Sequence, residues 1–130
     1  MERGITMMLS NDARIVLTYL QSVIEDRLKK HTPGLLISLN MYAYSRYGKY
    51  ATQLFTADPK AFVDLLRTYF RGNEEMVVRM IRYLLKPLND AGDKGIEAIN
   101  ALIRGDNEEF IKLSVKLLKK EAKKWLKELK

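Results

Sequence analysis

The chain has 130 residues, of which 47% are hydrophobic and 30% are charged, and this length and balance are typical of one folded domain. It contains no cysteine and one histidine, which excludes disulfides, thiolate metal sites and any site that needs two imidazoles from one chain. No apolar run approaches the roughly 20 residues that a membrane-spanning helix needs. We therefore expect a single domain over residues 1–130 with no membrane span.

The net charge of +7 is concentrated near the C-terminus. Residues 1–109 hold fifteen lysines and arginines and fourteen acidic residues, whereas residues 110–130 hold eight lysines and two glutamates. Electrostatic attraction to a partner is therefore expected mainly in the last segment.

Residues 1–9 are too few and too weakly apolar for a secretory signal, so we expect a cytoplasmic protein. Cysteine is absent, glutamine occurs only at Gln21 and Gln53, and lysine, arginine and glutamate are abundant. That bias is compatible with a thermophilic source.

Capping residues and glycines divide the chain into helices. Residues 10–12 offer caps for a first helix, whose apolar residues return at helical spacing as far as Leu28. Thr32-Pro33 combines a capping hydroxyl with a proline at the first helical position, and Gly48 is suited to end this second helix. Residues 50–56 are ambiguous between an irregular connection and a short turn of helix.

Asp58-Pro59 repeats the cap-and-proline start, and Gly72 stops the third helix. Asn73 caps a fourth helix, which Pro87 ends or kinks. Gly105-Asp106 separates a shorter fifth helix from the last one, which nothing interrupts to the end of the chain. These signals predict an all-α bundle of about six helices with irregular or orthogonal packing and a long basic amphipathic C-terminal helix.

The last helix is expected to carry a wide apolar face and a lysine-coated outer face over about 24 residues. Its apolar residues follow a heptad seam, and we expect partner contacts at these positions: Ile111, Val115, Leu118, Ala122, Trp125 and Leu129. Three interpretations stay open. The seam packs on its own domain, its part beyond Leu118 meets another chain to form a dimer, or the basic face binds nucleic acid, an anionic membrane surface or an acidic partner.

Residues 42–50 combine four tyrosines with Arg46 and Lys49, and interleaved aromatic and cationic side chains can stack single-stranded bases. Packing against the domain is the more usual role of such tyrosines, and contact with a partner protein is a third alternative. Nucleic-acid contacts, if they form, are expected at the following residues: Arg46, Tyr47, Lys49, Lys116, Lys119, Lys120, Lys123, Lys124 and Lys127.

No catalytic constellation is recognisable in the sequence. His31 lies beside lysines at a helix end without an acid or nucleophile at a motif spacing. The pairs Glu74-Glu75 and Glu108-Glu109 fall in first turns, where the helix dipole favours negative charge. Phosphate-binding loops and nucleophile-elbow motifs are also missing. We therefore expect no enzyme activity, metal, cofactor or small-molecule substrate.

A pattern of apolar, aromatic and turn residues runs through the middle half of the chain. Its members are Leu36, Leu39, Tyr42, Ser45-Arg46-Tyr47-Gly48, Asp58-Pro59, Phe62, Leu66, Phe70-Arg71-Gly72, Val77, Ile81 and Leu84. This pattern resembles a family of small archaeal helical domains of the Nitrosopumilus output-domain type. The resemblance implies an archaeal intracellular output or regulatory module, with no catalytic residues to transfer.

The sequence therefore favours a non-enzymatic interaction or regulatory module that acts through helix-mediated protein contacts, as a homodimer or with a protein partner. The alternative is a nucleic-acid-binding accessory protein that uses the lysine-rich C-terminal helix and residues 42–50.

Overall fold

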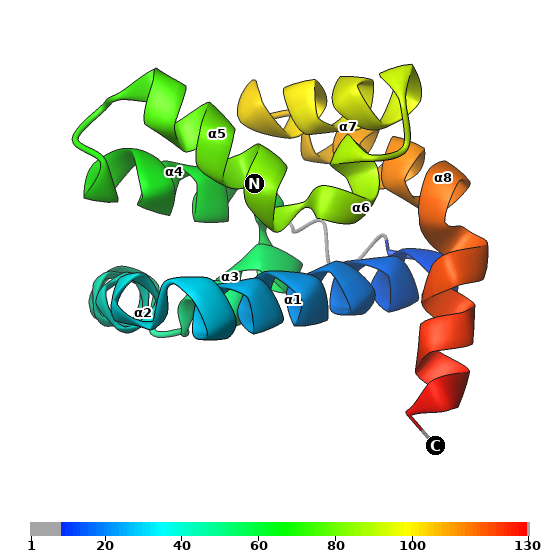
Figure 1. Ribbon diagram of the computed structural model, residues 1–130, viewed down its shortest axis with the longest axis horizontal. Coiled ribbons are helices and arrows are strands. Elements are labelled where there is room, and N and C mark those ends of the chain that lie inside the picture. Colours follow the sequence, from blue (N-terminus) through cyan, green and yellow to red (C-terminus); the bar gives the residue numbers. More distant parts are fainter. Residues whose placement is uncertain (1–8, 130) are drawn as a thin grey trace.

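The computed structural model describes residues 9–129, and within that range it contains eight α-helices and no strand (Figure 1). The helices are α1 (Asn11–His31), α2 (Pro33–Tyr47), α3 (Ala51–Ala57), α4 (Pro59–Tyr69), α5 (Glu74–Leu84), α6 (Lys86–Asn89), α7 (Asp93–Ile103) and α8 (Asn107–Glu128). The predicted all-α class is confirmed. Residues 1–8 and 130 lie outside the described range, as does most of the segment 1–9 on which the expectation about a secretory signal depends.

Three helices begin at side-chain caps that the sequence predicted. The Ser10 hydroxyl accepts a hydrogen bond from the Ala13 N–H at 3.1 Å, at the start of α1. The Asn73 and Asp106 side chains accept in the same way from the third residue beyond them, at 3.2 and 3.0 Å. Each bond satisfies a backbone donor that the first helical turn leaves without a partner.

The two proline starts differ from the prediction in how they are capped. α2 and α4 do begin at Pro33 and Pro59, but neither Thr32 nor Asp58 caps its helix with its side chain. For α4 the cap comes from a distant residue, because the Asn107 side chain accepts from the Lys60 N–H at 2.9 Å. The Asn107 amide also donates to the Asp58 carboxylate at 2.7 Å, which ties the starts of α4 and α8 together.

The predicted count of six helices is wrong because two short helices were missed. α3 occupies the stretch that the sequence left ambiguous, and α6 is a single turn that follows α5. Pro87 lies in the first turn of α6, where its missing N–H costs no hydrogen bond, so it starts a new turn instead of kinking α5. α8 is the long C-terminal helix expected, at 22 residues instead of about 24.

α1 runs through the body, with α2 at its C-terminal end and α8 crossing near its N-terminal end (Figure 1). α4, α5, α6 and α7 lie together on one side of α1 in this view. Edge-on aromatic contacts join α3, α4 and α8 in the core, since Phe55 lies 5.8 Å from Phe62 and 6.1 Å from Phe110 between ring centroids. One continuous apolar core therefore reaches both long helices.

Among the described residues, no helix is both long enough and apolar enough to cross a membrane.

Candidate functional site

The apolar seam of α8 is mainly an internal packing surface. Five of its six residues are buried or pack partly buried against the core: Ile111, Val115, Leu118, Ala122 and Trp125. Only Leu129 is exposed, with 64% of its surface accessible. α1 and α7 of the same chain cover this helix, which favours the interpretation that the seam from Ile111 to Ala122 packs on its own domain. Partner contacts at the seam, whose last residue is open to solvent, stay a prediction.

The second half of α8 is held against the start of α1. The Tyr19 hydroxyl donates to the Glu121 carboxylate, and the Tyr19 and Trp125 rings lie 5.6 Å apart between centroids. Asp12 pairs with Lys123 at 3.2 Å and with Lys119 at 3.7 Å. Burial, followed by the hydrogen bond to Glu121, raises the pKa of the Tyr19 hydroxyl above its ordinary value. These contacts hold Trp125 against α1 of the same chain.

α2 presents the opposite situation, because much of its apolar surface is exposed. Of its 15 residues only Leu39 and Ala43 are buried. Ile37, Met41 and Tyr44 are 62%, 67% and 59% exposed. The interpretation that the tyrosines of this stretch serve mainly as core packing is therefore too simple, although Tyr42 does contact Tyr69, at 6.0 Å between ring centroids.

The composition of α2 makes this exposure unusual. From Pro33 to Tyr47 the helix contains a single charged residue, Arg46, so it has no charged solvent face. A helix at a protein surface usually turns its charged and polar residues to solvent, because apolar surface is stabilised by covering it. Here one face packs against α1, α3 and α4, and the other is open.

A hollow of about 560 Å³ lies on this open face. Its lining is mostly apolar and comes from α2 and the connection to α3: Ile37, Asn40, Met41, Tyr44, Ser45 and Tyr50. We call these six residues the α2 groove. They include three side chains at i, i+4 and i+7, which share one face of the helix.

The α2 groove is fixed by a tight reversal of the chain. Gly48 ends α2 in the left-handed conformation (φ 71°), which a residue with a side chain rarely adopts. The chain then turns back, and Tyr50 lies 5.5 Å from Tyr44 between ring centroids with the rings tilted by 34°. The Asn40 side chain accepts from the Ala51 N–H at 2.9 Å and so holds the start of α3 against α2. The groove is therefore formed in the unbound chain.

The residues predicted to contact nucleic acid fall into two separate groups. Arg46, Tyr47 and Lys49 lie beside the end of α2, and all three are exposed. The predicted lysines of α8 are exposed as well, near the opposite end of α1: Lys116, Lys119, Lys120, Lys123, Lys124 and Lys127 (Figure 1). α1, which lies between α2 and α8, has 21 residues and is about 30 Å long at 1.5 Å per residue. The fold does not unite them into one surface.

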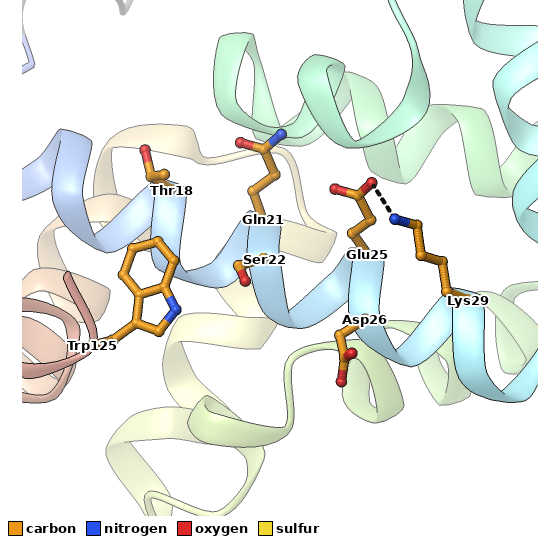
Figure 2. Close-up of a pocket in the computed structure, with 7 residues that line it drawn as sticks. All are labelled: Thr18, Gln21, Ser22, Glu25, Asp26, Lys29 and Trp125. Carbon is orange, nitrogen blue, oxygen red and sulfur yellow. Dashed lines mark ion pairs between the residues drawn. The ribbon is translucent and has the colours of Figure 1, made fainter. Parts of the chain in front are cut away.

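A polar hollow of about 380 Å³ follows the outer face of α1, with Trp125 at one end (Figure 2). Its charged lining is paired along the helix, since Lys29 lies 3.3 Å from Glu25, and Asp26 lies 3.5 Å from Lys30. Such i, i+4 pairs are the usual pattern of a solvated helix face. Within residues 9–129, no cluster of three or more histidine, cysteine or acidic side chains could hold a metal ion.

The most connected charged side chain, Arg67, joins three helices. It donates to Glu74 and to Asp64, and its Nη2 donates to the Ile103 carbonyl oxygen at 2.8 Å. The hydrogen bond to Glu74 is the main reason that the pKa of Arg67 is raised. Arg67 lines none of the hollows described above, so we assign it to the packing of α4, α5 and α7.

Sequence reasoning missed Ile37, Asn40 and Met41 as functional candidates and included Tyr44 and Tyr50 only within an aromatic stretch. A signal for them was present in the sequence, because residues 33–45 contain no charged side chain.

Comparisons with protein-family models, with curated proteins and with solved structures gave no match. The function is therefore argued from the surfaces themselves.

Proposed function

We propose that this protein is a non-enzymatic interaction module of the cytoplasm that acts through helix-mediated protein contacts, and that the α2 groove is its docking surface. The observation that carries the proposal is the exposure of Ile37, Met41 and Tyr44 on a helix without a charged face. The resemblance of the middle of the chain to small archaeal output domains agrees with a regulatory role of this kind.

The residue types of this surface support a protein partner. The central parts of protein–protein interfaces are enriched in tyrosine, methionine and arginine and depleted in lysine and acidic residues. The exposed residues of α2 follow this pattern, with Met41, Tyr44, Arg46 and Tyr47 among them. Exposed lysines, by contrast, are frequent on α8.

The size of the surface also supports docking. A large aromatic side chain presents roughly 150–250 Å² when fully exposed, and Tyr44 and Tyr50 each keep more than half of their surface accessible. With Ile37 and Met41 beside them, the apolar patch amounts to a few hundred Å², and the largest patch on a monomer, which is of this size, is often functional.

Binding of an uncharged helix tests this proposal. The probe is a fluorescein-labelled amphipathic peptide of roughly 20 residues, with leucine at heptad positions a and d and glutamine elsewhere. We expect saturable binding by fluorescence anisotropy, and a loss of at least about tenfold in affinity for Met41→Glu, because the charge would be buried in the contact.

Leu129→Glu is the matched control, since Leu129 is a similarly exposed apolar residue that directly follows α8, away from α2. It should bind the peptide as the unchanged protein does. Equal binding by Met41→Glu, a loss confined to Leu129→Glu, or an absence of saturable binding would each overturn the proposal.

Nucleic-acid binding is the second candidate function, and the exposed Tyr44, Tyr47 and Tyr50 beside Arg46 and Lys49 favour it. Such binding should fall steeply with salt, because phosphate contacts release counterions. Anisotropy with single-stranded DNA and RNA at low salt measures it. An absence of binding there would eliminate this candidate.

A further inference from the structure

We infer that the outer face of α8 binds the phosphate backbone of double-stranded nucleic acid without regard to its base sequence. This face consists of six exposed residues, which we call the α8 lysine face: Lys116, Lys119, Lys120, Lys123, Lys124 and Lys127. The inference goes beyond the proposed docking of a protein helix. It does not depend on the α2 groove, because α2 and α8 lie at opposite ends of α1 (Figure 1).

The α8 lysine face is not interrupted by residues of another kind. At about 100° per residue, its six members fall within an arc of about 140° around the helix. No other residue between 116 and 127 falls within that arc. Glu121 lies on another side of the helix, where it accepts the hydrogen bond from the Tyr19 hydroxyl. The face therefore presents positive charge with no acidic residue of α8 between its cations.

The lysines of this face extend from a helix that is fixed to the body of the protein. Leu118 and Ala122, on the opposite side of α8, are buried in the core. The Trp125 ring lies 5.6 Å from the Tyr19 ring between centroids, and α1 and α7 cover the helix. The folded chain therefore already holds the lysine positions in a straight row before any partner binds.

Most of the cations on this face are free to bind a partner. Four of the six form no ion pair within residues 9–129: Lys116, Lys120, Lys124 and Lys127. Lys119 and Lys123 share the single carboxylate of Asp12, at 3.7 and 3.2 Å. Their side chains remain 49% accessible. Six lysines and one carboxylate thus leave a strongly positive face.

The spacing of the positive charges matches that of a duplex backbone. Lys116 and Lys127 are 11 residues apart, which corresponds to about 16.5 Å along the helix axis, so the six lysines follow one another about every 3.3 Å. One strand of a duplex carries a phosphate about every 3.4 Å along its axis. An acidic helix would need a carboxylate at roughly every second residue to offer the same charge density.

The chemistry of the face fits phosphates better than bases. Lysine binds phosphate as a point charge, whereas reading of base edges favours bidentate side chains such as arginine, asparagine and glutamine, and the face contains none of these. Single-stranded nucleic acid is usually held by aromatic side chains that stack on its bases. The face has no aromatic residue, and the Trp125 ring is held against Tyr19. A duplex bound by its backbone is therefore the form that fits.

An anionic membrane fits the same helix less well. Helices that lie on a membrane bury their apolar face among the lipid chains and leave the cationic face toward water. In α8 the apolar face is covered by α1 and α7 of the same chain, with Leu118 and Ala122 buried. Only electrostatic attraction would remain for a lipid surface, without the apolar contribution.

Fluorescence anisotropy with short duplexes tests the inference. The probes are fluorescein-labelled duplexes of roughly 20 base pairs, two DNA sequences that share no common motif and one RNA sequence. We expect binding at low salt, with affinities for the two DNA sequences within about threefold of each other. With four to six phosphate contacts, the slope of log K against log salt concentration should be about −3.5 to −5.5. Tighter binding of the DNA or of the RNA duplex supports the inference and identifies the source of the backbone.

The double variant Lys120→Gln, Lys124→Gln locates the contact on α8. It should lower the affinity at low salt by at least about tenfold and reduce the magnitude of the salt slope by about 2. The matched control is Arg71→Gln, Arg82→Gln, which removes the same charge from two exposed arginines at the turn before α5 and on α5. The control should keep most of the affinity and the slope. Circular dichroism should show both variants folded, because all four residues are exposed.

Several outcomes would overturn the inference while leaving the docking of a helix to the α2 groove intact. These are no binding of either kind of duplex at low salt, an equal loss in the control variant, and tighter binding of single strands than of duplexes. A loss confined to the variant Arg46→Gln, Lys49→Gln would assign nucleic acid to the end of α2 instead. Tighter binding to vesicles that contain phosphatidylserine than to the duplexes, lost in Lys120→Gln, Lys124→Gln, would assign the face to a membrane.

Discussion

α8 and α2 differ both in the charge of their sequences and in the exposure of their apolar residues. α8 is the most basic helix of the chain and carries an apolar seam, yet α1 and α7 cover that seam from Ile111 to Ala122. α2 carries one charged residue, yet Met41 and Tyr44 on its outer face are open to solvent. The domain itself therefore covers the apolar face of the amphipathic helix α8. The open apolar face of α2, at the end of the body, is the surface that we propose docks a partner.

The difference comes from position in the fold. α8 lies across the start of α1 and beside α7, so two helices supply apolar surface to it. α2 follows α1 at the far end, where α1, α3 and α4 contact it from one side (Figure 1). Substitutions in the two helices should therefore separate stability from binding.

The largest effect on stability is expected from Leu118→Ala in α8. Leu118 is buried in the core, and the substitution leaves a cavity, so the free energy of unfolding should fall by about 2–5 kcal/mol. Urea denaturation followed by circular dichroism measures it. A loss below about 0.5 kcal/mol, the usual range for surface positions, would mean that the seam is not covered in solution.

A smaller loss is expected from Tyr19→Phe, which removes the hydroxyl that donates to Glu121 and keeps the ring against Trp125. A hydrogen bond to a charged group contributes about 1.5–3 kcal/mol, and we expect a loss near the lower end of that range in the same denaturation experiment. Tyr83→Phe is a suitable control, because the hydroxyl of Tyr83 makes no side-chain hydrogen bond to the rest of the described chain.

The contribution of Tyr19 should also depend on pH. Its pKa in the folded chain is raised above the ordinary value of 10.0, so the folded state favours the neutral hydroxyl. The resulting stability is fully present below pH 10 and is lost as the pH rises from there through the folded pKa, because the unfolded chain ionises first. The advantage of the unchanged protein over Tyr19→Phe should therefore be constant near neutrality and shrink in unfolding curves above pH 10. An advantage that grows with alkaline pH would contradict the buried pairing.

The smallest effect on stability is expected from Met41→Glu. Met41 is exposed, so the free energy of unfolding should change by no more than about 0.5 kcal/mol, although peptide binding is lost. A loss comparable to that of Leu118→Ala would show that Met41 is part of the core and would end the contrast between the two helices.

Much of the fold could be predicted because its signals are local. Ser10, Asn73 and Asp106 cap helices as their residue types indicate, and Gly48 ends α2 in the left-handed conformation that glycine favours. α3 was missed because its start is held by a contact from another helix, the hydrogen bond from the Ala51 N–H to the Asn40 side chain. α6 was missed because Pro87, which the sequence suggested would end or kink α5, is the second residue of a new helical turn. The cap that Asn107 gives to α4 joins residues 47 positions apart, which no local pattern indicates.

The candidate site was harder to predict because exposure is a property of the whole fold. The apolar residues of α2 and of α8 look alike in sequence, and periodicity cannot tell which of them a neighbour will cover. The arrangement of the neighbouring helices decides this, because α1 and α7 cover the apolar seam of α8, whereas α1, α3 and α4 contact α2 from one side. Met41 and Ala122 illustrate the result, since the first is open and the second is buried.

Nuclear magnetic resonance with the isotope-labelled protein and the leucine–glutamine heptad peptide tests most directly whether α2 is the docking helix. We expect the largest amide shift changes in α2 and in residues 48–51, with little change from Ile111 to Ala122. Shift changes concentrated on α8, with α2 unaffected at saturating peptide, would contradict the assignment.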